Sequence, residues 1–533
     1  MTPADALAAC RIYPDRAATF LHLPESAPTT GIPLAVKDNI DVAGMPTTAG
    51  CPGFAYQPTE DAAVVARLRA AGYVPVAKTA LDQFATGLVG TRSPHGVPVN
   101  PVVPGKIPGG SSSGSACAVS AGLVPVALGT DTAGSGRVPA AFQGLVGLKP
   151  TKGWWSTRGV VPAVRSLDCI SVFARTVAEA WAVAEIAGGF DPADPFSRVK
   201  PEVTLPVGSL RIGVLAEDEL TAVALPQRAA YDQAQVYLRG LGHTLVPIDF
   251  TPFREAAGLL YGGAWVAERT AAVGAAVAAG VAGLDPTVAG IIAGGHRFTA
   301  VQAWQGTYDL ARLRRAADFQ WQAMDVLLLP TVTDHPTPAE VAADPVGVNS
   351  RMGRFTNFAN LLDTCALAVP ITPTPAGITL FAPAWHDLLL ARLGAALQDA
   401  AFSRPQPQVI PGDDGGLELA VFGAHRQGFP LHAQLLGFGA RFVGPCRTAP
   451  VYRVYRLSGK VARPALVHGG DGAFSGELYR LPAAGVGRLL ATIAPPLGLG
   501  TVELEGGYLV KGFIAEGRAA LGAEDITAWG AWR

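Results

Sequence analysis

The sequence predicts an α/β fold, because helical and strand patterns alternate along the first four hundred residues. Residues 59–72 carry apolar positions at helical spacing between a capping Thr59 and a closing Gly72. Residues 73–77 follow as a strand, the same order returns at 227–247, and another strand is expected at 324–330. This alternation predicts a sheet that is layered by helices.

The chain is long enough for two domains. It has 533 residues, 49% of them hydrophobic and 16% charged, so it can bury a large core. Residues 405–416 combine prolines, acids and glycines between apolar segments, which predicts a linker. We therefore expect one domain at residues 1–404 and a second at 417–533. The second is Gly-rich and has strand-like runs at 419–422, 452–457 and 500–504.

The charge balance argues against a nucleic-acid partner, and the cysteine spacing argues against a metal site. The 41 Lys and Arg residues nearly match the 42 Asp and Glu residues, and no basic stripe predicts nucleic-acid binding. The six cysteines have neither metal-ligand nor C-x-x-C spacing, so we expect buried thiols in a reducing compartment. They are Cys10, Cys51, Cys117, Cys169, Cys365 and Cys446.

Targeting signals are not evident, and we expect a cytoplasmic protein that does not bind membranes. Residues 1–15 contain charges and no apolar core of a signal peptide. The most membrane-like stretch, residues 271–293, is interrupted by Asp285 and Pro286, which predicts two packed helices instead of a membrane span.

Two Gly/Ser clusters organise the first domain. GGSSSGSA at residues 109–116 and GTDTAGSG at 129–136 flank an apolar segment that predicts a helix from Ala116 and a strand at 124–128. Pro139 suits the first turn of a further helix. Ser135 should thus lie between a strand and a helix, where unpaired N–H groups can stabilise a developing negative charge.

Lys37 is a candidate base for such a serine. It ends the strand-like run at residues 31–40, within Lys37-Asp38-Asn39. A lysine at a strand edge is usually salt-bridged or extended toward solvent. Burial instead lowers its pKa, and a neutral amine can accept a proton from a serine nucleophile.

Four motifs together resemble one known family. KDN, GGSSSGSA, GTDTAGS and GLKPT at residues 147–151 occur in the order and at the separation of the amidase signature family of serine amidohydrolases. The resemblance covers about the first four hundred residues. It implies a three-layer α/β/α domain with a central mixed sheet, and it implies neither metal nor cofactor.

The resemblance also assigns catalytic roles. Ser135 matches the family's nucleophile, Ser111 the bridging serine that follows a cis peptide bond, and Lys37 the base. The oxyanion hole that it implies is formed by the N–H groups of Thr132, Ala133 and Gly134.

Other interpretations of the first Gly/Ser loop are weaker. Residues 110–114 also fit G-x-S-x-G, the nucleophile elbow of α/β-hydrolases, but that elbow must follow a strand. Residues 101–108 contain too many prolines to form one. A phosphate-binding loop is disfavoured because no G-K-[ST] follows the glycines.

Two further segments resemble the allophanate hydrolase branch of this family. They are STRGVVPAVRSLDC at residues 156–169 and LLYGGAWVAER at 259–269. Tyr261 and Arg269 are eight apart, so we expect both on one face of a helix. A core tyrosine and a surface arginine are the alternatives. The resemblance implies that they line the pocket, where Arg269 can bind a substrate carboxylate and Tyr261 can supply a hydroxyl.

Residues 353–370 also resemble this branch. Asn357 and Asn360 within them order a loop near the site, or are simply buried helical asparagines.

The second domain resembles the carboxy-terminal domain of allophanate hydrolases, through residues 419–435 and 523–533. The resemblance implies an α+β fold similar to γ-glutamylcyclotransferase-like folds. It also implies decarboxylation of N-carboxycarbamate, with His425 as the acid/base. A structural histidine is the alternative interpretation.

The function expected from this resemblance is hydrolysis of allophanate to ammonia and N-carboxycarbamate, which decarboxylates. Alternatives are an amidase for another small ureido or amide acid such as biuret, and a glutaminase subunit of a tRNA-dependent amidotransferase. The appended domain and the near-neutral charge disfavour the last. We expect a homodimer with possible functional coupling to urea carboxylase.

Overall fold

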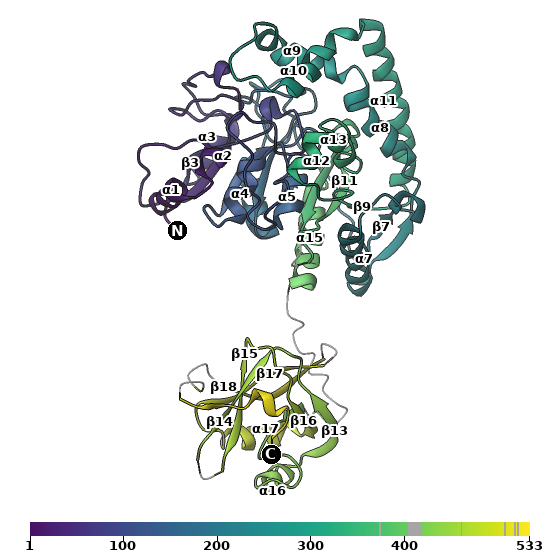
Figure 1. The fold of residues 1–533 in the computed structure, drawn as a ribbon. Helices are drawn as coiled ribbons and strands as arrows, with labels where there is room; N and C mark the ends of the chain where they lie inside the picture. The colour runs from purple at the N-terminus through teal and green to yellow at the C-terminus, as the bar shows by residue number, and fades with distance from the viewer. Residues whose placement is uncertain are drawn as a thin grey trace. The chain divides into compact units, whose positions relative to one another are not determined.

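The computed structural model describes residues 1–372, 375–402, 417–459, 461–505, 508–515, 519 and 522–532. The chain forms two compact units, residues 1–402 and 403–533 (Figure 1). The predicted linker at residues 405–416 lies outside the described residues.

The first unit is built on a mixed sheet, which confirms the predicted α/β class. In the described residues this sheet contains eleven strands in the order β1-β3-β2-β4-β6-β5-β10-β11-β9-β7-β8. β2 runs parallel to β3 and β4, whereas β10 is antiparallel to β5 and β11. The strands are β1 (Phe20–His22), β2 (Ile32–Lys37), β3 (Tyr73–Thr79), β4 (Val126–Thr130), β5 (Val146–Lys149), β6 (Ile170–Ala174), β7 (Arg211–Val214), β8 (Thr244–Pro247), β9 (Val326–Pro330), β10 (Thr364–Val369) and β11 (Ile378–Pro383).

Helices cover both faces of this sheet. Successive side chains of a strand point to opposite faces, so Leu34 and Val36 of β2 enter one hydrophobic cluster and Ala35 enters another. The cluster with Ala35 contains side chains of α1 (Pro3–Ile12), α4 (Ser113–Ser120) and α5 (Val138–Gln143). The cluster with Leu34 contains side chains of α3 (Ala63–Ala70), α6 (Val177–Ala187), α7 (Leu225–Gly240) and α15 (Asp387–Phe402).

The predicted helix at residues 59–72 is shorter than expected. α3 begins at Ala63. Its N-cap residue is Ala62, which has no side chain that could cap the helix, so the prediction of Thr59 as the cap is wrong. The preceding segment is bound elsewhere: Ala62 donates its N–H to Asp41 O, and Asp61 accepts the N–H of Ala43. These contacts hold residues 61 and 62 outside the helix.

The apolar stretch at residues 271–293 forms parts of two packed helices, as predicted. α9 (Trp265–Ala278) is followed by α10 (Pro286–Ala293), whose first turn is capped by Asp285 accepting from Val288 N at 2.9 Å. Throughout the described part of the chain, every helix is too short or too polar to cross a membrane. The other helices of this unit are α2 (Arg16–Thr19), α8 (Thr251–Gly262), α11 (Ala300–Trp321), α12 (Pro338–Ala343), α13 (Gly347–Met352) and α14 (Phe358–Leu361).

The second unit is β-rich. Its described residues form a five-stranded sheet, β13-β16-β12-β18-β17, and a three-stranded sheet, β15-β14-β19. The three predicted strand-like runs correspond to β12, β14 and β17. The elements are β12 (Leu417–Val421), α16 (His432–Gly437), β13 (Arg441–Arg447), β14 (Tyr452–Leu457), β15 (Arg463–His468), β16 (Ser475–Leu481), α17 (Ala483–Leu490), β17 (Leu497–Leu504), β18 (Tyr508–Ala515) and β19 (Glu524–Asp525).

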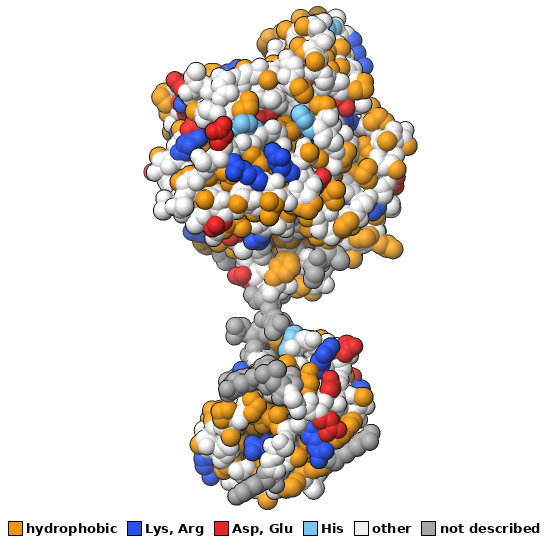
Figure 2. Space-filling view, turned by 60° about the vertical axis from the view of Figure 1, so that its left-hand side comes forward, with side chains coloured by type: hydrophobic (Ala, Val, Ile, Leu, Met, Phe, Trp, Pro, Cys, Tyr) orange, Lys and Arg blue, Asp and Glu red, His pale blue; other side chains and the backbone are white. Residues whose placement is uncertain are grey.

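Each unit has its own hydrophobic core. Two clusters, around Val454 and around Tyr479, consist only of residues from the second unit. On the described part of the face in Figure 2, several basic side chains gather at the middle of the first unit, acidic side chains lie scattered around them, and no long basic stripe is visible.

Candidate active site

Lys37 is buried at the end of β2 and contacts two hydroxyl groups. Its Nζ lies 2.7 Å from Ser111 Oγ and 2.6 Å from Thr130 Oγ1. Burial lowers the pKa of Lys37 to about 7, although the negative charges of Asp82, Asp131 and Asp168 oppose this shift. A large fraction of this amine is therefore neutral near neutral pH, as a general base requires.

Ser111 lies in the turn that precedes α4, and the Gly110–Ser111 peptide bond is cis. Asp82 organises this turn: its N–H donates to Ser111 O at 3.0 Å, and its carboxylate accepts the N–H groups of Gly90 and Arg92. A Cβ at residue 110 would overlap the Asp82 carboxylate, so only glycine fits there. The turn thereby directs Ser111 toward Lys37.

Ser135 lies in the loop between β4 and α5, as predicted, and it is buried. Its Oγ donates to Gly87 O at 3.4 Å. Among the hydrogen bonds of the described residues, none joins the hydroxyls of Ser135 and Ser111. The structure thus brings Lys37 and Ser111 into contact and leaves Ser135 bound to a backbone carbonyl.

The loop that carries Ser135 is held by buried polar contacts. Arg137 forms a buried bidentate ion pair with Asp131, at 2.9 Å for both contacts, and Asp131 also accepts Gly136 N. Thr132 Oγ1 donates to Asp168 Oδ1 at 2.5 Å. These bonds fix the loop without using its central N–H groups.

Those central N–H groups are available to a ligand. In the described hydrogen-bond network, the backbone N–H groups of Thr132, Ala133 and Gly134 have no acceptor. Gly134 has a φ of +141°, and a Cβ there would overlap Thr356, so glycine is needed to form this turn. A run of preorganised donors next to a serine hydroxyl can stabilise an oxyanion.

Asn360 supports the same loop from α14. Its Nδ2 donates to Asp131 O at 2.6 Å and to Leu167 O at 2.7 Å. These contacts agree with the interpretation that Asn360 orders the loop, and not with that of a buried asparagine that only packs within its helix.

Tyr261 and Arg269 meet, but not through one helix as predicted. Tyr261 lies in the last turn of α8 and Arg269 in α9, because α8 ends at Gly262 and Gly263 has extended backbone angles. Arg269 Nη2 lies 3.3 Å from Tyr261 Oη, and the guanidinium carbon lies 5.1 Å from the ring centre. The alternative surface position of Arg269 is excluded because its side chain is buried.

Arg269 is a buried cation near Ser135. Its Nη1 donates to Thr86 Oγ1 at 3.0 Å, while Ser135 binds the carbonyl of the next residue, Gly87. Within the described residues, Arg269 forms no ion pair with a carboxylate, although its charge acts on the buried carboxylate of Asp168, and its Nε has no hydrogen-bond acceptor. A buried guanidinium in this state can bind the carboxylate of a ligand.

Sequence reasoning did not identify Thr130, Asp82, Thr86 or Asp168 as members of the site. Thr130 lies in the motif GTDTAGSG and Asp168 in RSLDC, so their places in these motifs could have marked them as site residues.

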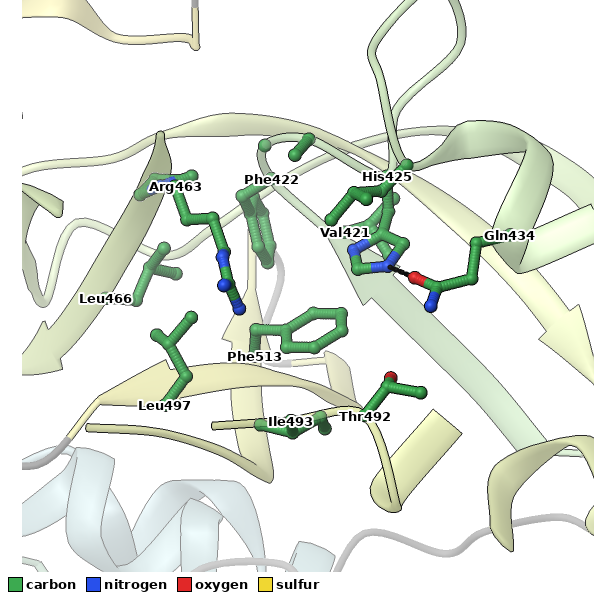
Figure 3. A pocket seen from close by; sticks show the side chains of 14 residues that line it. Val421, Phe422, His425, Gln434, Arg463, Leu466, Thr492, Ile493, Leu497 and Phe513 are labelled. Atoms are coloured by element: carbon green, nitrogen blue, oxygen red, sulfur yellow. Dashed lines mark hydrogen bonds between the residues drawn. The ribbon is translucent and has the colours of Figure 1, made fainter. Parts of the chain in front are cut away.

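His425 lies in the second unit, just after β12 (Figure 3). Its Nε2 is 3.2 Å from Gln434 Oε1, and its ring is stacked on Phe513 with ring centres 5.0 Å apart. Burial lowers the pKa of His425, the hydrogen bond with Gln434 opposes this shift, and the charge of Arg463 adds to it. This histidine borders a cavity and is half-buried.

Among the described residues, no group of three or more His, Cys, Asp or Glu side chains could hold a metal ion. All six cysteines are free thiols, and five of them are buried.

The comparisons with known proteins cover both units of the chain. A family model described as Amidase matches residues 1–390, and one described as Allophanate hydrolase C-terminal domain matches residues 417–533. Urea amidolyase of Saccharomyces cerevisiae is 40% identical over 551 residues, covering 96% of this chain and 30% of that protein. The chain thus spans about a third of the length of the urea amidolyases that it matches.

Solved structures agree with these matches. Allophanate hydrolase of Kluyveromyces lactis superposes with a TM-score of 0.72 at 38% identity, covering 100% of this chain and 96% of that chain. A glutamyl-tRNA(Gln) amidotransferase subunit of Thermotoga maritima superposes with a TM-score of 0.66 at 27% identity, covering 75% of this chain and 91% of that chain. The chain therefore belongs to the amidase family and carries an allophanate hydrolase C-terminal domain.

Proposed function

We propose that the chain is an allophanate hydrolase whose first unit cleaves the amide of allophanate. The observation that carries this proposal is the buried Arg269 guanidinium, which forms no ion pair with a carboxylate in the described residues. It binds Thr86, and the next residue, Gly87, accepts the hydrogen bond of Ser135. Allophanate joins a carboxylate to a terminal amide through one nitrogen. It therefore offers an anion to Arg269 and a carbonyl to Ser135.

In the proposed mechanism, Ser135 is the nucleophile, Ser111 the bridging residue and Lys37 the base. Neutral Lys37 accepts the Ser111 proton, Ser111 accepts the Ser135 proton, and Ser135 Oγ attacks the amide carbon. This relay requires Ser135 to exchange its bond with Gly87 O for one with Ser111. Catalytic hydrogen bonds of an empty site commonly tighten in this way when substrate binds.

The N–H groups of Thr132, Ala133 and Gly134 form the proposed oxyanion hole. Their lack of acceptors in the described network supports this role, and losing one such donor typically costs about 3–4 kcal/mol of barrier. The relayed proton then passes to the leaving nitrogen, which departs as ammonia. Water attacks the acyl group by the same relay and releases N-carboxycarbamate.

Tyr261 is proposed to bind the substrate together with Arg269. Its hydroxyl already lies against the guanidinium, so one ligand can contact both side chains. A carboxylate bound by a planar guanidinium forms two charge-assisted bonds, which an ammonium cannot reproduce.

For the second step we propose His425 as the acid/base that promotes decarboxylation of N-carboxycarbamate. Support comes from its position at a cavity and from the match of this unit to the allophanate hydrolase C-terminal domain. We also propose that this unit adopts a γ-glutamylcyclotransferase-like fold and that the first has three α/β/α layers. We further propose that the first domain extends over residues 1–404 and the second over 417–533, with residues 405–416 as the linker.

The proposed context is a cytoplasmic homodimer that is functionally coupled to a urea carboxylase activity. The buried free thiols support a reducing compartment, and the similarity to urea amidolyases supports the coupling.

One kinetic screen tests the proposal. The purified chain is assayed for ammonia release from allophanate, biuret, malonamate and glutamine. We expect allophanate to have the highest kcat/KM. Preference for biuret contradicts the carboxylate role of Arg269, and dependence of glutamine hydrolysis on a second polypeptide supports the amidotransferase alternative instead.

A further inference from the structure

A small cavity lies in the second unit, bordered by His425, Gln434 and Arg463 (Figure 3). We call it the His425–Arg463 cavity. Its volume is about 40 Å³, which is room for a few waters or a ligand of only a few non-hydrogen atoms. Apart from these three residues and Thr492, the lining side chains that the structure describes are apolar, with Phe422 and Phe513 as the largest.

Among its described residues, this cavity contains one positive charge without a carboxylate partner. Arg463 is the first residue of β15, and its guanidinium points into the cavity (Figure 3). Across the described residues, no side chain accepts a hydrogen bond from this guanidinium or forms an ion pair with it. The lining residues that the structure describes include no Asp or Glu, and among these residues His425 is the only other titratable group. Because apolar walls strengthen charge interactions, the cavity favours an anionic ligand.

The orientation of His425 is fixed from two sides. Since Gln434 Oε1 can only accept a hydrogen bond, Nε2 of the imidazole carries a proton. Phe513 stacks parallel to the ring, with an interplanar angle of 8°. Nδ1 then lies on the side of the ring turned away from Gln434, toward Phe422 and Arg463 (Figure 3). A ligand bound to Arg463 would therefore meet Nδ1.

We propose that the His425–Arg463 cavity binds a small planar anion of the carboxylate or carbamate class, with Arg463 as its carboxylate-binding residue and Gln434 as the positioning residue of His425. This inference rests on the proposed function, in which the ligand is N-carboxycarbamate. Arg463 holds the carboxylate that is retained, and Nδ1 faces the ligand nitrogen.

The step that follows is balanced. Protonated His425 donates its Nδ1 proton to the ligand nitrogen while the bond from that nitrogen to the outer carboxylate carbon breaks. The bonding electron pair stays on nitrogen, carbon dioxide leaves into the apolar part of the cavity, and the carbamate monoanion remains on Arg463. His425 regains its proton from solvent.

Anion binding and protonation should be coupled in this cavity. Burial lowers the pKa of His425 and the charge of Arg463 adds to this, while the hydrogen bond with Gln434 opposes the shift. An anion on Arg463 offsets that charge and favours the imidazolium, so binding should take up a proton.

The binding test uses malonate, in which a methylene replaces the nitrogen of N-carboxycarbamate. The Cε1–H resonance of His425 in the full chain is followed by NMR near pH 7 and assigned with His425→Gln. We expect malonate to move it toward the imidazolium position in the wild type and in the control Arg453→Gln, but not in Arg463→Gln. An unmoved wild-type resonance, or an equal response of Arg463→Gln, overturns the proposal.

The kinetic test measures carbon dioxide release relative to the first ammonia from allophanate. This ratio should fall in Arg463→Gln and stay at the wild-type value in Arg453→Gln. Gln434→Glu places a carboxylate on Nε2, so the pH profile of carbon dioxide release should move to higher pH; an unmoved profile contradicts the positioning role. Absence of ammonia release by the wild type refutes the proposed function, and the malonate experiment still decides on the cavity.

Discussion

Lys37 and Lys78 lie on the neighbouring parallel strands β2 and β3, and both are fully buried, yet only Lys78 is paired with a carboxylate among the described residues. Lys78 Nζ lies 3.2 Å from Asp38, whereas Lys37 contacts the hydroxyls of Ser111 and Thr130. Burial lowers the pKa of both amines, but the ion pair opposes the shift for Lys78. Lys37 is therefore the lysine suited to accept a proton.

Removing either end of the proposed relay should abolish turnover. We expect Ser135→Ala and Lys37→Ala to lower kcat for ammonia release by about 10⁴-fold or more, as for other catalytic units whose members act together. Ser120→Ala, at the end of α4 and outside the site, is the matched control. Thermal unfolding checks that each variant folds. Substantial residual activity of a folded Ser135→Ala protein contradicts its role as nucleophile.

The rate should depend on the ionisation of Lys37. Because the neutral amine is the base and its pKa is about 7, kcat/KM should rise with pH through about 7 and level off above it. Asp82 raises the pKa of Lys37, so Asp82→Asn should move this rise to lower pH. A pH series for both proteins measures the shift. A profile that is flat from about two units below this pKa to about two units above it contradicts the proposal.

Arg269→Lys should weaken substrate binding much more than its retained charge suggests. The ammonium cannot make the two parallel bonds of a guanidinium, so we expect KM for allophanate to rise by roughly 10²-fold. Arg165→Lys is the control, because Arg165 stacks on Phe196 instead of contacting Tyr261. Equal activity of Arg269→Lys and wild type removes the argument for carboxylate recognition.

A chain ending at Gly416 should retain the first step. The described residues of the first unit have their own hydrophobic clusters, so this unit should fold without residues 417–533. We expect ammonia release from allophanate near the wild-type rate, with slower carbon dioxide release. Measuring both products separates the two steps; loss of the first ammonia in a folded truncation indicates that the second unit is structurally required.

Local signals in the sequence were sufficient to predict the contact between Lys37 and Ser111, but not the bond of Ser135 to Gly87 O. Lys37, Ser111 and the loop around Ser135 stand in short motifs, and strands such as β12 and β14 have simple patterns. The supporting contacts could not be predicted in this way. Asn360 and Thr356 reach the loop from more than two hundred residues away, and only the tertiary fold brings them to Asp131 and Gly134.

Tyr261 and Arg269 illustrate a different limit. Their spacing fits one helix, but the chain breaks at Gly263, and the two side chains meet across a helix junction. The spacing therefore pointed to two residues that do lie in contact, but for an incorrect geometric reason. Arg463 could not be linked to His425 at all, because β15 and the segment after β12 become neighbours only in the folded second unit.

The N–H groups of residues 132–134, which have no acceptor among the described residues, also have a consequence for inhibitor chemistry. When Ser135 Oγ forms a bond with the boron of a boronic acid, the boron becomes tetrahedral and negatively charged. The N–H groups of residues 132–134 can then donate to one of the boronate oxygens. An analogue that also carries a carboxylate for Arg269 should act as a reversible inhibitor that binds at both places. It should bind more tightly than the substrate, because its tetrahedral form resembles the transition state and not the planar amide.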